Sequence, residues 1–210
     1  MLMTMTAAFA WLLLLALPSH QQQPATIQGS IRNLQGHPIS GATVYAYDSA
    51  HLTGRFVRLT TLSESDGSFV IHNVPPGNYA VHAFKESDGY ADTFWWFFRT
   101  NNTNAWKTVQ VSAGRTSSVA LALGPKYARL NVSIRNERGQ PVGGGLSFRR
   151  VDDRDPTYRV GVNADSERLV PPVSFSFDVQ APGYQTWHSP ILSPKPEESL
   201  TIVVRLTRSH

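Results

Sequence analysis

The sequence repeats one turn-centred motif at a fixed distance along the chain. Each copy is a Ser-Ile-Arg-Asn stretch followed by Gly, Pro, an aliphatic residue and a second Gly, and the copies lie 103 residues apart. They are Ser30-Ile31-Arg32-Asn33, Gly36, Pro38-Ile39 and Gly41, and then Ser133-Ile134-Arg135-Asn136, Gly139, Pro141-Val142 and Gly144. A second pattern also occurs twice: Val74-Pro75-Pro76 with a later Gly89-Tyr90, and Val170-Pro171-Pro172 with a later Gly183-Tyr184. In a chain of 210 residues, a repeat of this length predicts two tandem domains, at residues 24–124 and 125–210.

Apolar residues recur at every second position in short bursts bounded by Gly, Pro and Asp, and no segment keeps a helical period. This alternation is typical of half-buried strands. We expect all-β domains, each an antiparallel β-sandwich. The predicted strands are 25–32, 42–48, 56–62, 68–72, 78–84, 107–111 and 117–123 in the first copy, and 128–135, 145–150, 157–162, 173–180 and 200–206 in the second.

The N-terminus carries an apolar run at residues 7–17, followed at once by Pro18 and polar residues. The run is too short to span a bilayer as a helix and has the outline of a secretory signal peptide. We therefore expect residues 1–23 to be a signal peptide, with an uncleaved membrane anchor as the alternative. The expected location is secreted or periplasmic, in the cell envelope, with no membrane span after signal removal.

The sequence contains no cysteine, which excludes disulfides, thiolate metal sites and cysteine nucleophiles. The formal net charge is +4, and the arginines are spread along the chain without forming a run. Scattered arginines on a β protein cover apolar surface and pair with acids, so we expect no nucleic-acid partner.

The first copy resembles the carboxypeptidase regulatory-like domain, which has a transthyretin-like β-sandwich fold. The motifs that carry the resemblance are Gly29-x-Ile31, Gly36-x-Pro38-Ile39-x-Gly41-Ala42-x-Val44, Ser65-Asp66-Gly67-Ser68-Phe69, Val74-Pro75-Pro76-Gly77-Asn78-Tyr79 and Val109-x-Val111-x-Ala113-Gly114. The second copy lacks the Asp-Gly turn and has Val173 where Gly77 stands, so it resembles the family as a divergent member. The resemblance implies a module for folding, docking or carbohydrate binding, and no catalysis.

An aromatic segment interrupts the first copy, with three tryptophans and three phenylalanines between residues 94 and 106. We take as candidate ligand-binding residues Tyr90, Trp95, Trp96, Phe97 and Trp106. Read as a strand, the segment places Phe94, Trp96 and Phe98 on one face and Trp95 and Phe97 on the other. Three interpretations remain open: burial inside the first sandwich or between the two, an exposed partner-binding surface, and a platform for sugar rings with Trp95, Trp96 and Trp106.

Titratable residues do not form a recognisable catalytic or metal-binding pattern. Strand parity points Tyr79, Val81 and Ala83 inward and His82 outward, where His82 and His72 could meet across neighbouring strands. Two imidazoles do not make a zinc site without a third ligand. We therefore expect no enzyme, no metal and no cofactor.

Together these features predict an exported, non-enzymatic binding or scaffolding protein of the cell envelope. Its partner would be an envelope protein or glycan, held through β-sandwich modules. The alternative is a carbohydrate-binding module that uses the aromatic segment at residues 90–106.

Overall fold

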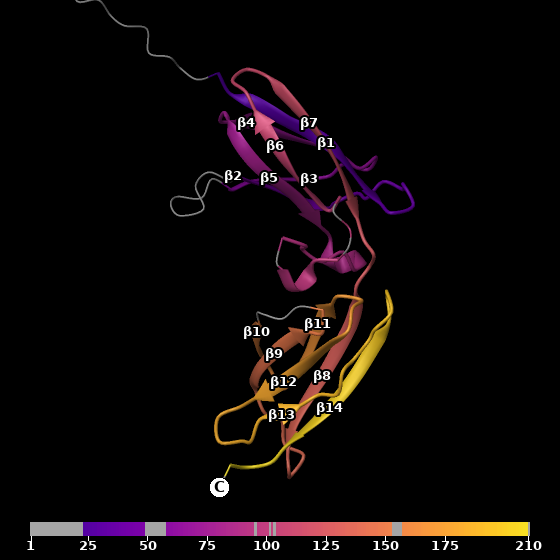
Figure 1. The fold of residues 1–210 in the computed structure, drawn as a ribbon, viewed down its shortest axis with the longest axis vertical. Helices are drawn as coiled ribbons and strands as arrows, with labels where there is room; N and C mark the ends of the chain where they lie inside the picture. Colours follow the sequence, from indigo (N-terminus) through magenta and orange to yellow (C-terminus); the bar gives the residue numbers. More distant parts are fainter. Residues whose placement is uncertain are drawn as a thin grey trace, which may run out of the picture.

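The computed structural model describes residues 23–48, 58–94, 96–100, 102, 104–152 and 157–209. The predicted signal peptide lies almost wholly outside the described residues. Two β-sandwiches lie end to end along the long axis of the molecule, with the aromatic segment between them (Figure 1). The all-β fold class and the tandem sandwiches predicted from the repeat are confirmed.

The first sandwich packs a three-stranded sheet of order β4-β1-β7 against a four-stranded sheet of order β3-β2-β5-β6. Strand alternation places the apolar side chains of both sheets in one core, which includes Ile27, Ile31 and Tyr79. The strands are β1 (Ala25–Asn33), β2 (Thr43–Asp48), β3 (Arg58–Leu62), β4 (Ser68–Val74), β5 (Gly77–Phe84), β6 (Trp106–Val111) and β7 (Thr116–Leu123).

The second sandwich repeats this arrangement, with sheets of order β11-β8-β14 and β10-β9-β12-β13. Five of its strands were predicted, whereas β11 and the two-residue β13 were missed. The strands are β8 (Ala128–Asn136), β9 (Gly144–Arg150), β10 (Tyr158–Val162), β11 (Asp165–Val170), β12 (Phe175–Gln180), β13 (Trp187–His188) and β14 (Ser199–Leu206). In each sandwich one pair is parallel, β1 with β7 and β8 with β14, and the other named strand pairs are antiparallel.

The repeated motif is a turn whose chemistry is the same in both copies. Asn33 Oδ1 accepts hydrogen bonds from the backbone N–H groups of Gln35 and His37, at 3.0 and 2.9 Å. Asn136 Oδ1 accepts the equivalent bonds at 3.0 and 2.9 Å. Gly36 and Gly139 have φ of +83° and +76°, values that favour glycine. The repeat therefore specifies a tight reversal that sends the chain from one sheet toward the other.

Two predictions about strand faces are wrong. His82 lies on the outer face of β5 but is completely buried, because the aromatic segment covers it. His72 is exposed on β4, and since β4 and β5 belong to different sheets, the two histidines do not meet across a hairpin. The aromatic segment is also not a strand: Trp96–Phe98 form a 3-10 helix, η3.

Candidate functional site

The connection between β5 and β6, residues 85–105, lies between the two sandwiches, and we call it the joint loop (Figure 1). It begins with a one-turn 3-10 helix, η2 (Glu86–Asp88), which ends at Gly89 with a φ of +85°. Asn102 ties the far end of the loop to the last strand of the first sandwich, donating to the carbonyls of Ala122 at 2.6 Å and Gly124 at 2.8 Å. Both ends of the loop are thereby held by the first sandwich.

Phe97 is the residue by which the joint loop enters the second sandwich. Its side chain is completely buried and belongs to the core of the second sandwich, although the residue lies in the first copy of the repeat. Its ring stacks on Tyr158 with centroids 4.9 Å apart and planes 8° apart, and lies 5.2 Å from the ring of Phe148. Burial of a phenylalanine side chain contributes about 1.5–3 kcal/mol to stability. Phe97 therefore joins the two cores.

Hydrogen bonds from the second sandwich hold the backbone around Phe97. Arg150 Nη1 donates to the carbonyls of Phe97, at 3.4 Å, and Arg99. The Tyr127 hydroxyl donates to the carbonyl of Phe98. Burial raises the pKa of Tyr127, so this phenol remains protonated and able to donate through the neutral pH range. The joint loop is thus held by the packing of its side chains and by hydrogen bonds to its backbone carbonyls.

On its other side, the joint loop covers an aromatic cluster on the first sandwich. Phe94 stacks on His82 and Tyr47, with centroids 5.0 and 5.2 Å apart. Asp92 Oδ1 lies 2.8 Å from His82 Nδ1 and accepts the Phe94 N–H at 3.0 Å. Neither ring nitrogen of His82 has a well-directed hydrogen bond among the described residues. Burial of His82 under Phe94 explains why strand parity alone gave the wrong environment.

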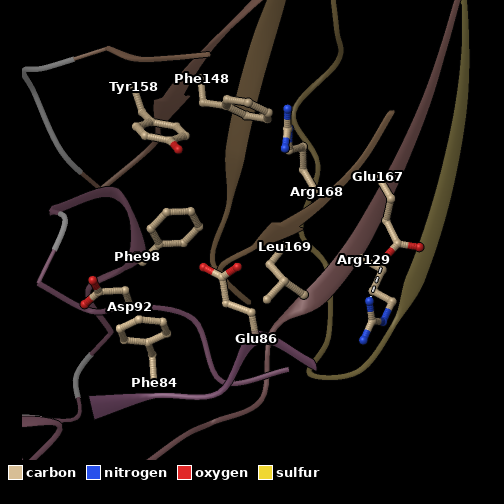
Figure 2. A pocket seen from close by; sticks show the side chains of 10 residues that line it. All are labelled: Phe84, Glu86, Asp92, Phe98, Arg129, Phe148, Tyr158, Glu167, Arg168 and Leu169. Atoms are coloured by element: carbon tan, nitrogen blue, oxygen red, sulfur yellow. Dashed lines mark hydrogen bonds and ion pairs between the residues drawn. The ribbon is translucent and has the colours of Figure 1, made fainter. Parts of the chain in front are cut away.

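A pocket of about 370 Å³ opens where the two sandwiches meet at the joint loop, and we call it the joint pocket. Its walls come from both sandwiches and combine four aromatic rings with five charged side chains (Figure 2). Arg129 and Glu167 form an ion pair at 2.6 Å at one side. The lining residues are Phe84, Glu86, Asp92, Phe98, Arg129, Phe148, Tyr158, Glu167, Arg168 and Leu169.

The candidate residues from the sequence do not form one surface. Tyr90 is buried in the first core and Phe97 in the second, while Trp106 is 40% exposed on β6. Trp95 and the side chain of Trp96 lie outside the described residues. Arg99 lies over the Trp106 ring at 5.9 Å. The three candidates whose side chains the structure describes, Tyr90, Phe97 and Trp106, do not line the joint pocket.

Sequence reasoning missed most of the joint pocket because half of it comes from the second sandwich. Tyr158 and Arg168 lie more than 50 residues beyond the joint loop, so no local spacing links them to Glu86. Tyr45 and Tyr47, which cover the sheet beside the pocket, were also missed. Their outward parity on β2, between the buried Val44 and Ala46, is a signal that could have identified them.

Two searches of the described residues were negative. No group of three His, Asp or Glu side chains is placed to hold a metal ion in the part of the chain that the structure describes. Across the same residues, no helix has the length and apolar character needed to cross a membrane.

The fold defines a two-domain β-sandwich protein of the transthyretin-like type. The model of the carboxypeptidase regulatory-like domain family matches residues 26–124, the first sandwich. The family model thus covers the first sandwich and ends at the junction. No curated protein sequence gives a significant match to the chain.

Three solved structures align with most of this chain at low sequence identity. The TIE protein of Bacillus anthracis is 12% identical with a TM-score of 0.39, and the match covers 89% of this chain and 34% of that one. A streptococcal ancillary pilin is 12% identical with a TM-score of 0.40, over 90% of this chain and 63% of that one. A minor pilin of Streptococcus agalactiae is 12% identical with a TM-score of 0.37, and the match covers 89% of this chain and 97% of that one. This chain thus spans about a third of the length of the TIE protein and less than two thirds of the length of the ancillary pilin. The similarity does not assign a role.

Proposed function

We propose that the chain is an exported, non-enzymatic binding or scaffolding protein of the cell envelope, acting through protein contacts of its β-sandwiches. The observation that carries the proposal is the insertion of Phe97 into the second core. A scaffold must hold its binding surfaces in a fixed relation, and domains joined by a short linker alone move relative to one another. An aromatic side chain of the first copy that is buried in the second core restricts that motion.

The first sandwich supports the same proposal through its family. A carboxypeptidase regulatory-like domain is a module without catalytic machinery of its own, appended to other functions.

The proposal is tested with the full chain in its source cells. Fractionation and N-terminal sequencing of the mature protein would place it in the envelope and locate the signal cleavage site. Cross-linking in intact cells, followed by quantitative mass spectrometry, should enrich a defined envelope protein with the wild-type chain. The Phe97→Ala variant should enrich it less. Hydrolytic turnover that depends on a named side chain of this protein would overturn the proposal.

A second candidate function is carbohydrate binding through the aromatic segment, and it is favoured by Trp106. This indole is partly exposed, and it lies directly across the sheet from His82 and Tyr45. A partly exposed indole offers a flat apolar face to the C–H surface of a sugar. Loss of glycan binding in Trp106→Ala would support this function, and unchanged binding would remove its main support.

A further inference from the structure

The joint pocket contains one buried donor without a hydrogen-bond partner among the described residues and one exposed carboxylate without an ion pair among them. Arg168 Nε is buried and has no hydrogen-bond partner among the described residues, although Nη2 of the same side chain donates to the Gly161 carbonyl at 3.3 Å. The carboxylate of Glu86 pairs with no Lys or Arg in the described part of the chain. Buried polar groups in native proteins are normally satisfied, so an unsatisfied donor in a pocket is a reason to expect a ligand.

A third polar group completes the set. The hydroxyl of Tyr158 lines the pocket and makes no hydrogen bond to the other described residues. Burial raises the pKa of Tyr158, with the Glu86 charge adding to the effect and Arg168 opposing it. The phenol therefore stays protonated at neutral pH and can both donate and accept. Figure 2 shows Glu86, Tyr158 and Arg168 on different sides of the same space.

The remaining walls of the pocket are apolar and ring-shaped. Phe98 and Tyr158 form a corner, with centroids 5.5 Å apart and planes 69° apart. Phe84, Phe148 and Leu169 complete the lining. Pockets for small molecules combine such apolar walls with a few fixed polar groups, and they measure about 300–1,000 Å³. At about 370 Å³, the joint pocket suits a ligand of one or two rings.

The charges of the pocket limit the chemistry of that ligand. An anion would lie beside Glu86 and Asp92, and a cation would lie beside Arg168, while Arg129 and Glu167 neutralise each other. A neutral ligand with several hydroxyl groups avoids both penalties. Its hydroxyls can donate to Glu86 and accept from Arg168 Nε, while its C–H face lies against the rings of Phe98 and Tyr158.

We propose that the joint pocket binds a neutral saccharide unit, held by Glu86, Tyr158 and Arg168 between the two sandwiches. This goes beyond the scaffolding function, which requires no small ligand. It also differs from the second candidate function, because Trp106, which supports that function, does not line this pocket.

The proposal is tested by calorimetric and NMR titration of the full chain with methyl glucoside, methyl galactoside, N-acetylglucosamine and cellobiose. We expect one of these probes to bind saturably at a single site. Glu86→Gln removes the carboxylate charge, Tyr158→Phe removes the hydroxyl, and Arg168→Lys removes the Nε donor of the guanidinium. Because hydrogen bonds to charged groups contribute strongly to binding, Glu86→Gln and Arg168→Lys should weaken affinity about ten- to a hundredfold.

Matched controls separate the possible outcomes. Glu64→Gln removes the same charge from an exposed turn of the first sandwich and should leave affinity unchanged. Thermal unfolding of every variant shows whether it is folded. If none of the four saccharides binds, or if Trp106→Ala abolishes binding while the pocket variants bind normally, the proposal is wrong. Because cross-linking to an envelope protein is measured separately, failure of the pocket and failure of the scaffolding function are distinguishable.

Discussion

The two sandwiches have the same strand order but differ most in the connection that precedes the fourth strand of the larger sheet. In the first sandwich this connection is the joint loop, residues 85–105, whereas in the second it is residues 181–186. The long connection carries Phe97 into the other core, and the short one leads to the two-residue β13. The repeated turns therefore specify each sandwich, while the unrepeated insertion specifies how the sandwiches are joined.

A second difference lies inside the cores, at equivalent positions of β1 and β8. Gly29 in the first sandwich corresponds to the buried Val132 in the second, 103 residues later. Gly29 pairs with Phe69, whereas Val132 pairs with Ser166. At this position the larger side chain comes from β4 in the first sandwich, as Phe69, and from β8 in the second, as Val132. The copies conserve the volume of this core layer while exchanging which strand supplies it.

The largest expected effect on this comparison comes from Phe97→Ala. The change removes a completely buried ring from the second core, and substitutions of this kind cost about 3–5 kcal/mol of stability. We expect the second sandwich to unfold at lower urea concentration, although the substituted residue lies in the first. Urea unfolding followed by residue-resolved NMR measures each sandwich separately. An equal loss of unfolding free energy in both sandwiches, or no loss in either, would show that Phe97 does not stabilise the second core specifically.

The exchange of core volume is tested by Gly29→Val. A Cβ at this position would lie 2.0 Å from the Val119 carbonyl oxygen and 2.7 Å from the Phe69 ring, so the strand must shift. Overpacking of this kind costs about 1–3 kcal/mol. In the double variant Gly29→Val with Phe69→Ser, the free energies of unfolding should be non-additive, with the pair less destabilised than the sum of the singles. Strict additivity in chemical denaturation would contradict the proposed exchange.

The smallest expected effect concerns acid stability, to which each sandwich contributes through a different carboxylate. Hydrogen bonds from Ser68 hold the pKa of Asp66 below 3.8 in the first sandwich, and Ser133 and then Arg135 lower that of Asp165 in the second. A lowered folded-state pKa adds stability above the unfolded-state value and loses it as the pH falls below about 4. Asp66→Asn and Asp165→Asn should each reduce the difference in urea midpoint between pH 6 and pH 3. If a variant keeps the pH dependence of the wild type, the substituted carboxylate does not contribute to acid stability.

Local sequence patterns predicted most strands because alternation and turn chemistry act over a few residues. Asn33, Gly36 and their counterparts at 136 and 139 made the reversals recognisable, and Tyr79, Val81 and Ala83 point inward as expected. The strand β11 was missed because Asp165–Val170 has polar residues at its first four positions. Its apolar content is too low to show a period of two.

The site was harder to predict because its residues are brought together by the joint between the sandwiches. Nothing near His82 in the sequence indicates that Phe94 covers it, and nothing near Phe97 indicates that Tyr158 receives it. The alternation rule assigns a residue to one face of its own sheet. It does not state what a distant loop places over that face, and for this reason His82 was assigned to solvent.

The joint loop also changes the mechanics of the molecule. A single covalent connection, residues 124–127, would act as a pivot about which the second sandwich could swing and twist. Phe97, buried in the second core, and the contacts of Arg150 with the carbonyls of Phe97 and Arg99 add a second point of attachment. Two attachment points resist torsion, so a pulling force applied at the far ends is carried as tension through both cores. Twisting of one sandwich against the other would therefore require Phe97 to leave the second core.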